Sequence, residues 1–344
     1  MSTVIILTET ILQLTYAVSI RDSCFEGKKV VIIWFGNTNV KKEYPMIFSK
    51  KNVEYIFIEN PTRKNFIMLG SSIKNISSKV IHLKNHDCEL ITYYDTHPGF
   101  EIIKDTLSIS WDRVGLIEDG THNYLSNISM PAYQNRLVKH YINKILGRYP
   151  VNLSYYNLGG NKLIKLFYVM SPENAFVADP EQARVISIAD DVKTFLSKID
   201  IDVPERLGKI DVFLTLAPVY KYRRLNKEQL FSFIFRLIEK FNSKITVVKP
   251  HMKDSLFGIR EDLSELKKEG IIIAPDIATE FLFKKIPETN WVGNVSTAML
   301  NRHFLYPDYR DIFHIFDEGK SPTFEKEKKC MQKILKAKYK HGKF

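Results

Sequence analysis

Short runs of apolar, often β-branched residues alternate along the chain with longer amphipathic stretches, and this alternation most constrains the fold. Apolar runs of about four to eight residues between turn-forming residues are typical of buried strands. Apolar residues that recur every three or four positions are typical of helices packed on one face. Strands that alternate with helices predict parallel sheets covered by helices. The sequence therefore predicts an α/β fold.

The alternation occurs twice, once in each half of the chain. In the first half we expect strands at Val4–Leu7, Lys29–Phe35, Val53–Ile58, Val80–Leu83, Leu90–Tyr94 and Val114–Ile117, and helices over Thr10–Ile20 and Pro131–Leu146. In the second half we expect strands at Ile210–Leu216, Ile245–Val248, Ile271–Ala274, Asn290–Val292 and Ile312–Phe316, and helices over Asn226–Phe241, Arg260–Lys268, Ala278–Phe283 and Ser296–Arg302. Two doubly wound, Rossmann-like sheets follow from this pattern.

The length of 344 residues agrees with about two domains. Residues 150–209 break both patterns and contain a Gly-Gly pair and the prolines Pro172, Pro180 and Pro204, so the domain junction is expected there, near residue 180. We therefore expect an N-terminal domain over residues 1–180, a C-terminal domain over 181–320 and a basic C-terminal helix over 321–344.

The charge distribution weakens the case for a nucleic-acid-binding protein. The net charge is +11, and the nine lysines and two glutamates of residues 320–344 supply +7 of it. A dispersed nucleic-acid groove would need basic residues throughout, so no specific nucleic-acid partner is expected. Three separate cysteines without a C-x-x-C pair suit a reducing compartment and no zinc site. No signal sequence or membrane-spanning stretch is recognised, which favours a cytoplasmic location.

Polar residues that directly follow strands are the candidates for chemistry, because ligands of open α/β sheets bind beyond the carboxyl ends of the strands. Glu118, Asp119 and Gly120 follow the strand expected at Val114–Ile117. One of the two carboxylates could act as a base, and the glycine permits a tight turn. The alternative is an exposed turn, since Asp-Gly is a common turn dipeptide.

Two more candidates follow strands of the second half. Lys249, Pro250 and His251 follow one strand, where lysine and histidine could bind a phosphate and histidine could donate a proton. Ser296 and Thr297 stand where a helix should begin, so their hydroxyls and the free backbone N–H groups could bind an anion. The alternatives are a solvated loop histidine and an ordinary serine N-cap.

Several nucleotide-binding signatures are absent from the sequence. It contains no Gly-x-Gly-x-x-Gly, no Walker loop and no Asp-x-Asp after a strand. The sequence therefore lacks the motifs that define dinucleotide dehydrogenases, P-loop kinases and metal-dependent sugar transferases. We expect no metal and no cofactor.

The order Glu118-Asp119-Gly120, then His251, then Ser296-Thr297 resembles the motifs of bacterial sialyltransferases of GT-B architecture, namely the lipooligosaccharide sialyltransferases and capsule polysialyltransferases. Residues 211–218 also resemble the strand that opens the second domain of these enzymes, and residues 8–17, with Gln13, resemble their first loop and helix. One departure is that the family has His-Pro, whereas Met252 follows His251 and Pro250 precedes it. The resemblance covers most of the chain, and each motif is short.

The resemblance implies two Rossmann-like domains facing a cleft and an inverting, metal-independent transfer of sialic acid from CMP-sialic acid to a hydroxyl of a cell-surface glycan. Asp119 would take the acceptor proton, with Glu118 positioning it or sharing the charge. His251 would assist the departing phosphate, and Lys249, Pro250, Ser296 and Thr297 would hold the donor. The first domain would bind the acceptor and the second the donor.

Other functions stay open at this point. The donor could be another nucleotide sugar such as CMP-Kdo or a UDP-sugar, or the chain could be a non-catalytic surface-binding protein that acts through its basic tail. The tail is expected to form a helix that packs on the first domain, adheres to anionic lipid at the inner face of the plasma membrane, or does both. The acceptor, the linkage and the oligomeric state do not follow from the sequence.

Overall fold

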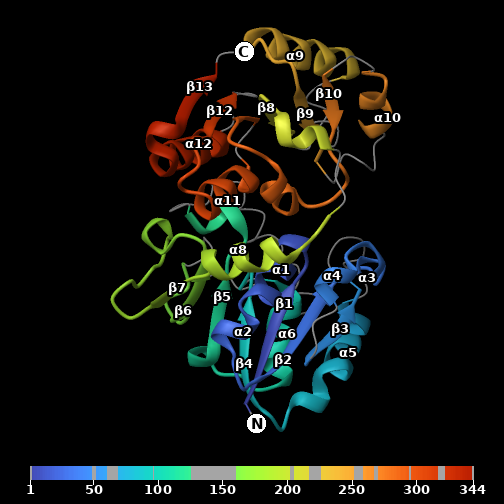
Figure 1. The fold of residues 1–344 in the computed structure, drawn as a ribbon. Coiled ribbons are helices and arrows are strands. Elements are labelled where there is room, and N and C mark those ends of the chain that lie inside the picture. The colour runs from blue at the N-terminus through green and yellow to red at the C-terminus, as the bar shows by residue number, and fades with distance from the viewer. Residues whose placement is uncertain are drawn as a thin grey trace. The chain divides into compact units, whose positions relative to one another are not determined.

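The computed structural model describes residues 2–48, 52–59, 69–95, 97–124, 160–201, 205–216, 226–251, 259–266, 270–293, 296–316 and 322–342. The chain forms two compact units, Met1–Phe195 and Leu196–Phe344. Each unit is built on a parallel β-sheet with helices, so the predicted α/β fold class is confirmed (Figure 1).

The first unit contains a seven-stranded sheet in the order β3-β2-β1-β4-β5-β6-β7. Its strands are β1 (Ser2–Thr8), β2 (Lys29–Phe35), β3 (Val53–Ile58), β4 (Asp87–Thr92), β5 (Val114–Ile117), β6 (Leu166–Val169) and β7 (Arg184–Ser187). The residues of β1 from Val4 to Leu7 are fully buried, as expected for a parallel strand with both faces covered.

Helices of the first unit connect these strands. They are α1 (Ile11–Ser19), α2 (Arg21–Cys24), α3 (Val40–Glu43), α4 (Pro45–Phe48), α5 (Leu69–Val80), α6 (Pro98–Thr106) and the 3₁₀ turns η2 (Ile81–Leu83), η3 (Trp111–Arg113), η4 (Gly120–Tyr124) and η5 (Pro172–Asn174). A reciprocal capping box begins α1: the Gln13 N–H donates to Thr10 Oγ1, and the Thr10 N–H donates to Gln13 Oε1. This cap fixes the Gln13 side chain beside the carboxyl end of β1.

The second unit contains a six-stranded parallel sheet in the order β10-β9-β8-β11-β12-β13. Its strands are β8 (Val212–Thr215), β9 (Thr246–Lys249), β10 (Ile271–Ile273), β11 (Asn290–Gly293), β12 (Ile312–Phe316) and β13 (Tyr339–Gly342). The helices are α8 (Ala189–Lys198), which crosses the division between the units, α9 (Lys227–Lys240), α10 (Ile259–Ser264), α11 (Thr297–Leu305), α12 (Pro322–Leu335) and the 3₁₀ turns η6 (Glu205–Lys209), η8 (Thr279–Lys285) and η9 (Lys336–Lys338). In both sheets the strand order reverses beside the first strand, which creates switch points at β1/β4 and β8/β11.

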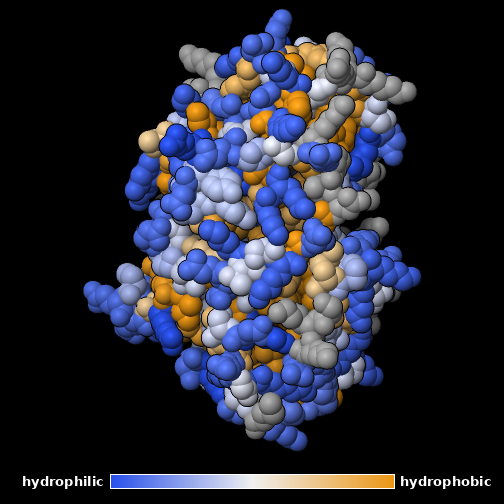
Figure 2. All heavy atoms as spheres, in the orientation of Figure 1, coloured by the Kyte–Doolittle hydropathy of each residue, from blue (hydrophilic) through white to orange (hydrophobic). Residues whose placement is uncertain are grey.

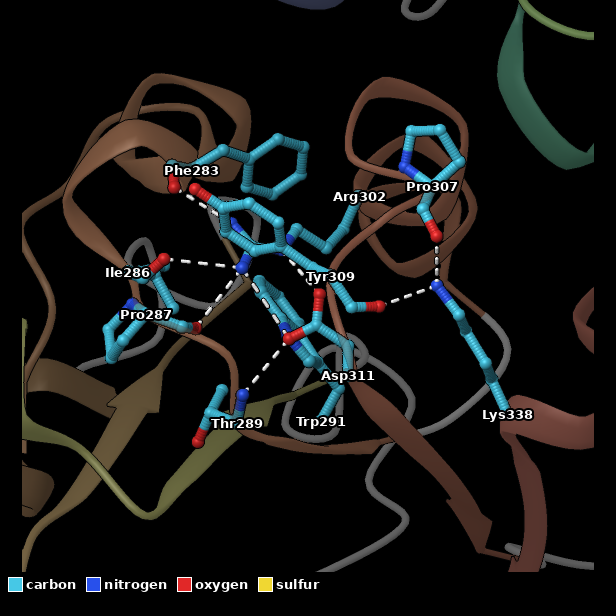
Figure 3. A network of polar contacts seen from close by, with 10 residues as sticks. All are labelled: Phe283, Ile286, Pro287, Thr289, Trp291, Arg302, Pro307, Tyr309, Asp311 and Lys338. Carbon is cyan, nitrogen blue, oxygen red and sulfur yellow. Dashed lines mark hydrogen bonds and ion pairs between the residues drawn. The ribbon is translucent and has the colours of Figure 1, made fainter.

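A fully buried arginine ties several segments of the second unit together (Figure 3). Arg302 Nε donates to Asp311 Oδ2 at 2.7 Å, Nη1 donates to the Phe283 carbonyl at 2.8 Å, and Nη2 reaches the carbonyls of Ile286 and Pro287 at 3.2 and 3.1 Å. Asp311 Oδ1 also accepts from the Thr289 N–H and the Trp291 indole N–H. These bonds connect α11, the end of η8, and the starts of β11 and β12.

Most of the predicted elements are confirmed at nearly the expected positions. Ile312–Phe316 forms β12 as predicted, and Asn226–Phe241 forms α9 between its two cap residues. Val80–Leu83 is not a strand, because it holds the end of α5 and the turn η2; so short an apolar run does not distinguish the two structures. The helix predicted over Pro131–Leu146 lies outside the described residues.

The segment predicted to separate the domains contains regular structure. Residues 150–209 include β6, β7 and most of α8, and β7 pairs with β6 in the first sheet. The boundary expected near residue 180 therefore precedes a strand of the first unit, and the compact units divide within α8. The short strands β6 and β7 were missed, and β7 lacks a fully buried apolar run, because its first and last residues are exposed.

The C-terminal basic tail differs from the expected single helix over residues 321–344. Helix α12 ends at Leu335, and β13 pairs in parallel with β12 as the last strand of the second sheet. Lys338 Nζ donates to the carbonyls of Pro307 and Tyr309, each at 2.6 Å (Figure 3). The tail is thus part of the second unit, and its adhesion to anionic membranes stays a prediction.

A chain shortened to end at Lys320 is expected to have a much less stable second unit. It loses β13, which leaves β12 as a bare edge, and it loses the buried side chains of Met331, Ile334 and Leu335. Burial of each such side chain contributes roughly 1.5–3 kcal/mol. Urea unfolding of the shortened and full chains measures the difference, and equal midpoints would contradict this role of the tail.

No helix among the described residues is long and apolar enough to cross a membrane. On the face of the molecule seen in Figure 2, hydrophilic side chains cover most of the surface and hydrophobic ones emerge in smaller patches between them.

Candidate active site

The first group of candidate residues lies at the carboxyl end of β5. Glu118 is fully buried, and its Oε2 accepts from the Met170 N–H and from the Tyr124 hydroxyl, each at 2.6 Å. Its Oε1 is buried and has no hydrogen-bond partner within the part of the chain that is described. Burial raises the pKa of Glu118 to about 8, although the two hydrogen bonds oppose the shift. Glu118 is therefore largely protonated at neutral pH.

Asp119 occupies a more accessible position than Glu118. Its side chain is half-buried, and the Gln13 amide N–H donates to its carboxylate. The Gln13 amide oxygen accepts in turn from the N–H groups of Glu9 and Thr10, so the cap of α1 orients the amide that contacts Asp119. Gly120 has φ of 81°, a conformation that favours glycine, and the turn starts η4. Asp119 is thus the more accessible of the two carboxyl groups.

The raised pKa of Glu118 predicts a pH-dependent stability of the first unit. The folded state keeps the Glu118 proton between its ordinary pKa of 4.5 and about 8, whereas the unfolded chain releases it. This contribution to stability is therefore fully present below about pH 4.5 and is lost as the pH rises to about 8. Glu118→Gln cannot ionise, so its unfolding free energy should fall less between these pH values than that of the unmodified protein. Urea titrations across this range measure both slopes, and equal slopes would exclude a buried, protonated Glu118.

Asp95 is a residue of this edge that the sequence patterns did not single out. It follows β4 at the β1/β4 switch point and is 1% exposed, and burial raises its pKa to about 7. His97, two residues later, caps α6 by accepting the Gly99 N–H at its Nδ1. The sequence did contain a pattern that could have identified Asp95 and His97, because these polar residues follow a strand and precede a helix that starts with proline.

The second group lies at the carboxyl end of β9 in the second unit. His251 is half-buried there, and Pro250 is buried. Lys249 is 4% exposed, and its ammonium donates to the Pro250 carbonyl at 3.1 Å. Burial lowers the pKa of Lys249 to about 8. Lys249 is therefore buried and already bonded within the chain, and its contact with a phosphate stays a prediction.

Ser296 and Thr297 lie at the beginning of α11, which follows β11. Ser296 is the N-cap, and its Oγ accepts from the Ala298 N–H at 3.2 Å. The ordinary capping role weighed for Ser296 is thus confirmed, and both side chains are half-buried. Gly293 ends β11 close to β8, because a Cβ on it would lie 2.1 Å from Thr215 Oγ1. The close packing brings the start of α11 toward the β8/β11 switch point.

A buried polar pair lies beside this edge and was not predicted. Glu280 of η8 is 6% exposed, and its Oε1 accepts from the fully buried Asn301 Nδ2 at 2.9 Å. Burial raises the pKa of Glu280, and the Lys249 charge opposes that shift. Neither residue stands directly after a strand, so no sequence pattern pointed to the pair.

Each unit thus carries a set of polar residues at the carboxyl edge of its own sheet: Glu118 and Asp119 in the first, His251, Ser296 and Thr297 in the second. Among the described residues no three His, Cys, Asp or Glu side chains form a group that could hold a metal ion. The arrangement supplies a carboxylate on one unit, and an imidazole and a helix N-terminus on the other. Such groups suit proton transfer and anion binding, respectively.

Comparisons with known proteins place this architecture in a recognised fold. No protein-family model and no curated protein matches the chain. Among solved structures, S. aureus MnaA with UDP is similar with a TM-score of 0.56 and 13% identity, over 92% of this chain and 79% of that one. UDP-GlcNAc 2-epimerase from Neisseria meningitidis bound to UDP-GlcNAc gives 0.54 and 13%, over 94% and 85%.

A plant enzyme has the same architecture. Phytolacca americana UGT2, complexed with UDP-2fluoro-glucose and pterostilbene, gives a TM-score of 0.52 and 11% identity, over 99% of this chain and 85% of that one. These similarities show that the chain has the two-domain GT-B fold, as expected. The identities are low, so the sialyltransferase resemblance stays a prediction.

Proposed function

We propose that the protein is a glycosyltransferase that takes a sugar from a nucleotide sugar and transfers it to a hydroxyl of a glycan. The observation that carries the proposal is that each sheet of a GT-B fold bears suitable groups at its own carboxyl edge, Asp119 on the first and His251 with the start of α11 on the second. Direct displacement of a nucleotide needs a base for the acceptor hydroxyl and a site for the departing phosphate, and these groups supply both.

The roles of the residues follow from their environments. Asp119 is half-buried and oriented by Gln13, so it acts as the base. The buried Glu118 instead accepts a hydrogen bond from Tyr124, at the end of η4. His251 stabilises the phosphate as the glycosidic bond breaks. The N–H groups at the start of α11, with Ser296 and Thr297, complete the anion site.

The nature of the nucleotide is the next question. The structural neighbours with UDP, UDP-GlcNAc or a UDP-sugar analogue favour a uridine nucleotide as the donor. The motif order that resembles sialyltransferases favours CMP-sialic acid instead, with a lipooligosaccharide or capsule glycan as acceptor. We give the UDP-sugar precedence, because the comparisons that align nearly the whole chain support it.

Incubation with UDP-GlcNAc, UDP-glucose, CMP-sialic acid and CMP-Kdo in turn tests the proposal. Release of UDP or CMP is measured with and without glycan acceptors, and with EDTA. Acceptor-stimulated release of one nucleotide is the expected result, and insensitivity to EDTA is expected from the proposed metal-independent mechanism. No release from any of the four donors would contradict the proposal.

Epimerisation of a UDP-sugar is a second candidate function, suggested by the neighbouring epimerases. Asp95 and Glu118 are two buried carboxyls at adjacent strand ends, with pKa values raised to about 7 and about 8, which suits proton transfer at neutral pH. Proton NMR of UDP-GlcNAc incubated with the protein distinguishes the candidates, because epimerisation changes the sugar without needing an acceptor.

Variants of the second-unit edge are expected to separate nucleotide binding from turnover. Ser296→Ala with Thr297→Ala removes ground-state contacts to the phosphate, so the affinity for the nucleotide should fall about tenfold or more. His251→Ala should reduce turnover more than affinity, since its contact strengthens as the phosphate departs. Calorimetric titration with UDP and CMP measures affinity, and unchanged affinity in the double variant would remove that pair from the donor site.

A further inference from the structure

A cavity of about 550 Å³ lies in the first unit, away from the residues proposed for sugar transfer. Its lining comes from four neighbouring strands, β4 to β7, from η3, and from the segment that begins at the end of α2. The strand residues that line it belong mainly to the amino-terminal and middle parts of their strands, whereas Glu118 and Asp119 follow the carboxyl end of β5. The cavity is therefore a separate feature of the sheet.

The register of the sheet explains the floor of the cavity. Ile91, Gly115, Leu166 and Arg184 are successive partners across β4, β5, β6 and β7, so their side-chain positions form one row on one face. Gly115 leaves a gap in this row. A Cβ at Gly115 would only reach ordinary contact, at 3.5 Å from Ile91 and Tyr168 atoms, so a larger side chain would extend into the hollow.

Two hydrogen-bond donors of this cavity have no partner among the residues that the structure describes. The Arg184 guanidinium is exposed and makes no ion pair or side-chain hydrogen bond with any described residue, and neither does the Tyr168 hydroxyl. The two are close: burial raises the pKa of Tyr168, and the Arg184 charge opposes that shift. An arginine fork beside a phenol is suited to a carboxylate or phosphate group.

The other charges around the cavity are largely paired. Lys28 Nζ lies 2.6 Å from Glu89 Oε1, and Arg113 lies 2.5 Å from Asp87. Asp112 also lines the cavity, as an exposed acid next to Arg113. Among the described residues that line the cavity, Arg184 is thus a cation without an ion-pair partner and can bind an anionic ligand. Phe25 and Ile186 add apolar surface.

We propose that this cavity binds a small organic anion whose single carboxylate or phosphate group contacts Arg184 and Tyr168 and whose apolar part lies over Gly115 and Leu166. The site is distinct from the donor and acceptor sites and takes a ligand of its own. The specificity of the site for its ligand rests on the charge of Arg184 and on the apolar space over Gly115. A ligand with a charge but no apolar part therefore binds more weakly.

Ligand-observed NMR with the full protein tests this site, using benzoate, phenyl phosphate and inorganic phosphate as probes. Saturable binding of benzoate or phenyl phosphate is expected, and inorganic phosphate should bind more weakly. Arg184→Gln should weaken binding of the organic probe at least about tenfold, since a charged hydrogen bond is lost. Gly115→Leu should abolish binding by filling the hollow, and Gly115→Ala should retain most of it.

Two controls separate this site from others. Lys162→Gln removes an exposed charge elsewhere on the first unit and should leave binding unchanged. Ser296→Ala with Thr297→Ala should also leave it unchanged, so a failed sugar-transfer proposal does not affect this test. If Gly115→Leu does not fold, binding to the surface variant Arg184→Gln tests the proposal instead. The proposal is overturned if the unmodified protein shows no saturable binding, if Arg184→Gln binds the organic probe as tightly, or if inorganic phosphate binds equally well.

Discussion

Asp119→Asn is expected to lower the rate of sugar transfer about 10²- to 10⁴-fold, the range that general base catalysis contributes. Asparagine keeps the size of the side chain and can still accept from the Gln13 amide, so the turn at Gly120 should be preserved. Only basicity is removed. Nucleotide binding should persist, because the proposed donor site lies on the other unit. Steady-state rates with the donor identified by nucleotide release measure the effect.

Two further variants sharpen this prediction. Gln13→Ala leaves the carboxylate in place and removes the amide that orients it, so it should lower the rate less than Asp119→Asn. Asp190→Asn changes an exposed aspartate at the first turn of α8 and serves as a matched control with little expected effect. Transfer at nearly the original rate by Asp119→Asn would show that Asp119 is not the base.

Asp311→Ala is expected to destabilise the second unit by about 3–5 kcal/mol, the cost of leaving a buried charge without its partner. Arg302 is fully buried and Asp311 is 2% exposed, so water cannot replace the lost carboxylate. The change also removes the acceptor of the Thr289 N–H and the Trp291 indole. Urea unfolding, followed by the fluorescence of the buried Trp291, measures the loss.

A surface pair and a double variant serve as controls. Asp200→Asn removes the exposed partner of Lys285 and should cost less than about 1 kcal/mol. Arg302→Met with Asp311→Leu replaces both charges by apolar groups and should recover part of the stability lost in Asp311→Ala. A single variant Asp311→Ala as stable as Asp200→Asn would mean that the Arg302 contacts with carbonyls suffice.

Residues whose structure depends on the local pattern could be predicted from the sequence. Ile312–Phe316 is a strand because its apolar run is short and bounded, and Ser296 begins a helix because its hydroxyl caps the first turn. The same strand exits placed Asp119 and His251 at sheet edges. Sequence order alone therefore located these candidates.

Features that depend on distant partners could not be predicted in this way. Lys249 was expected to bind a phosphate just after its strand, whereas in the structure it is the last residue of β9 and is buried. Strand β13 carries a lysine-rich sequence and becomes a strand only through pairing with β12. Arg302 was expected at the end of the helix predicted over Ser296–Arg302, and its burial depends on Asp311 and on carbonyls of η8 and the loop after it.

The two sheets also differ from interleaved folds in how their strands are drawn from the chain. Strands β1 to β7 all come from residues 2–187, and β8 to β13 all come from residues 212–342, so no strand of one sheet is supplied by the other stretch. During synthesis from the N-terminus, the first sheet can thus assemble before any strand of the second has emerged from the ribosome. Its long-range pairing of β1 with β4 then forms without competition from the parallel strands of the second sheet.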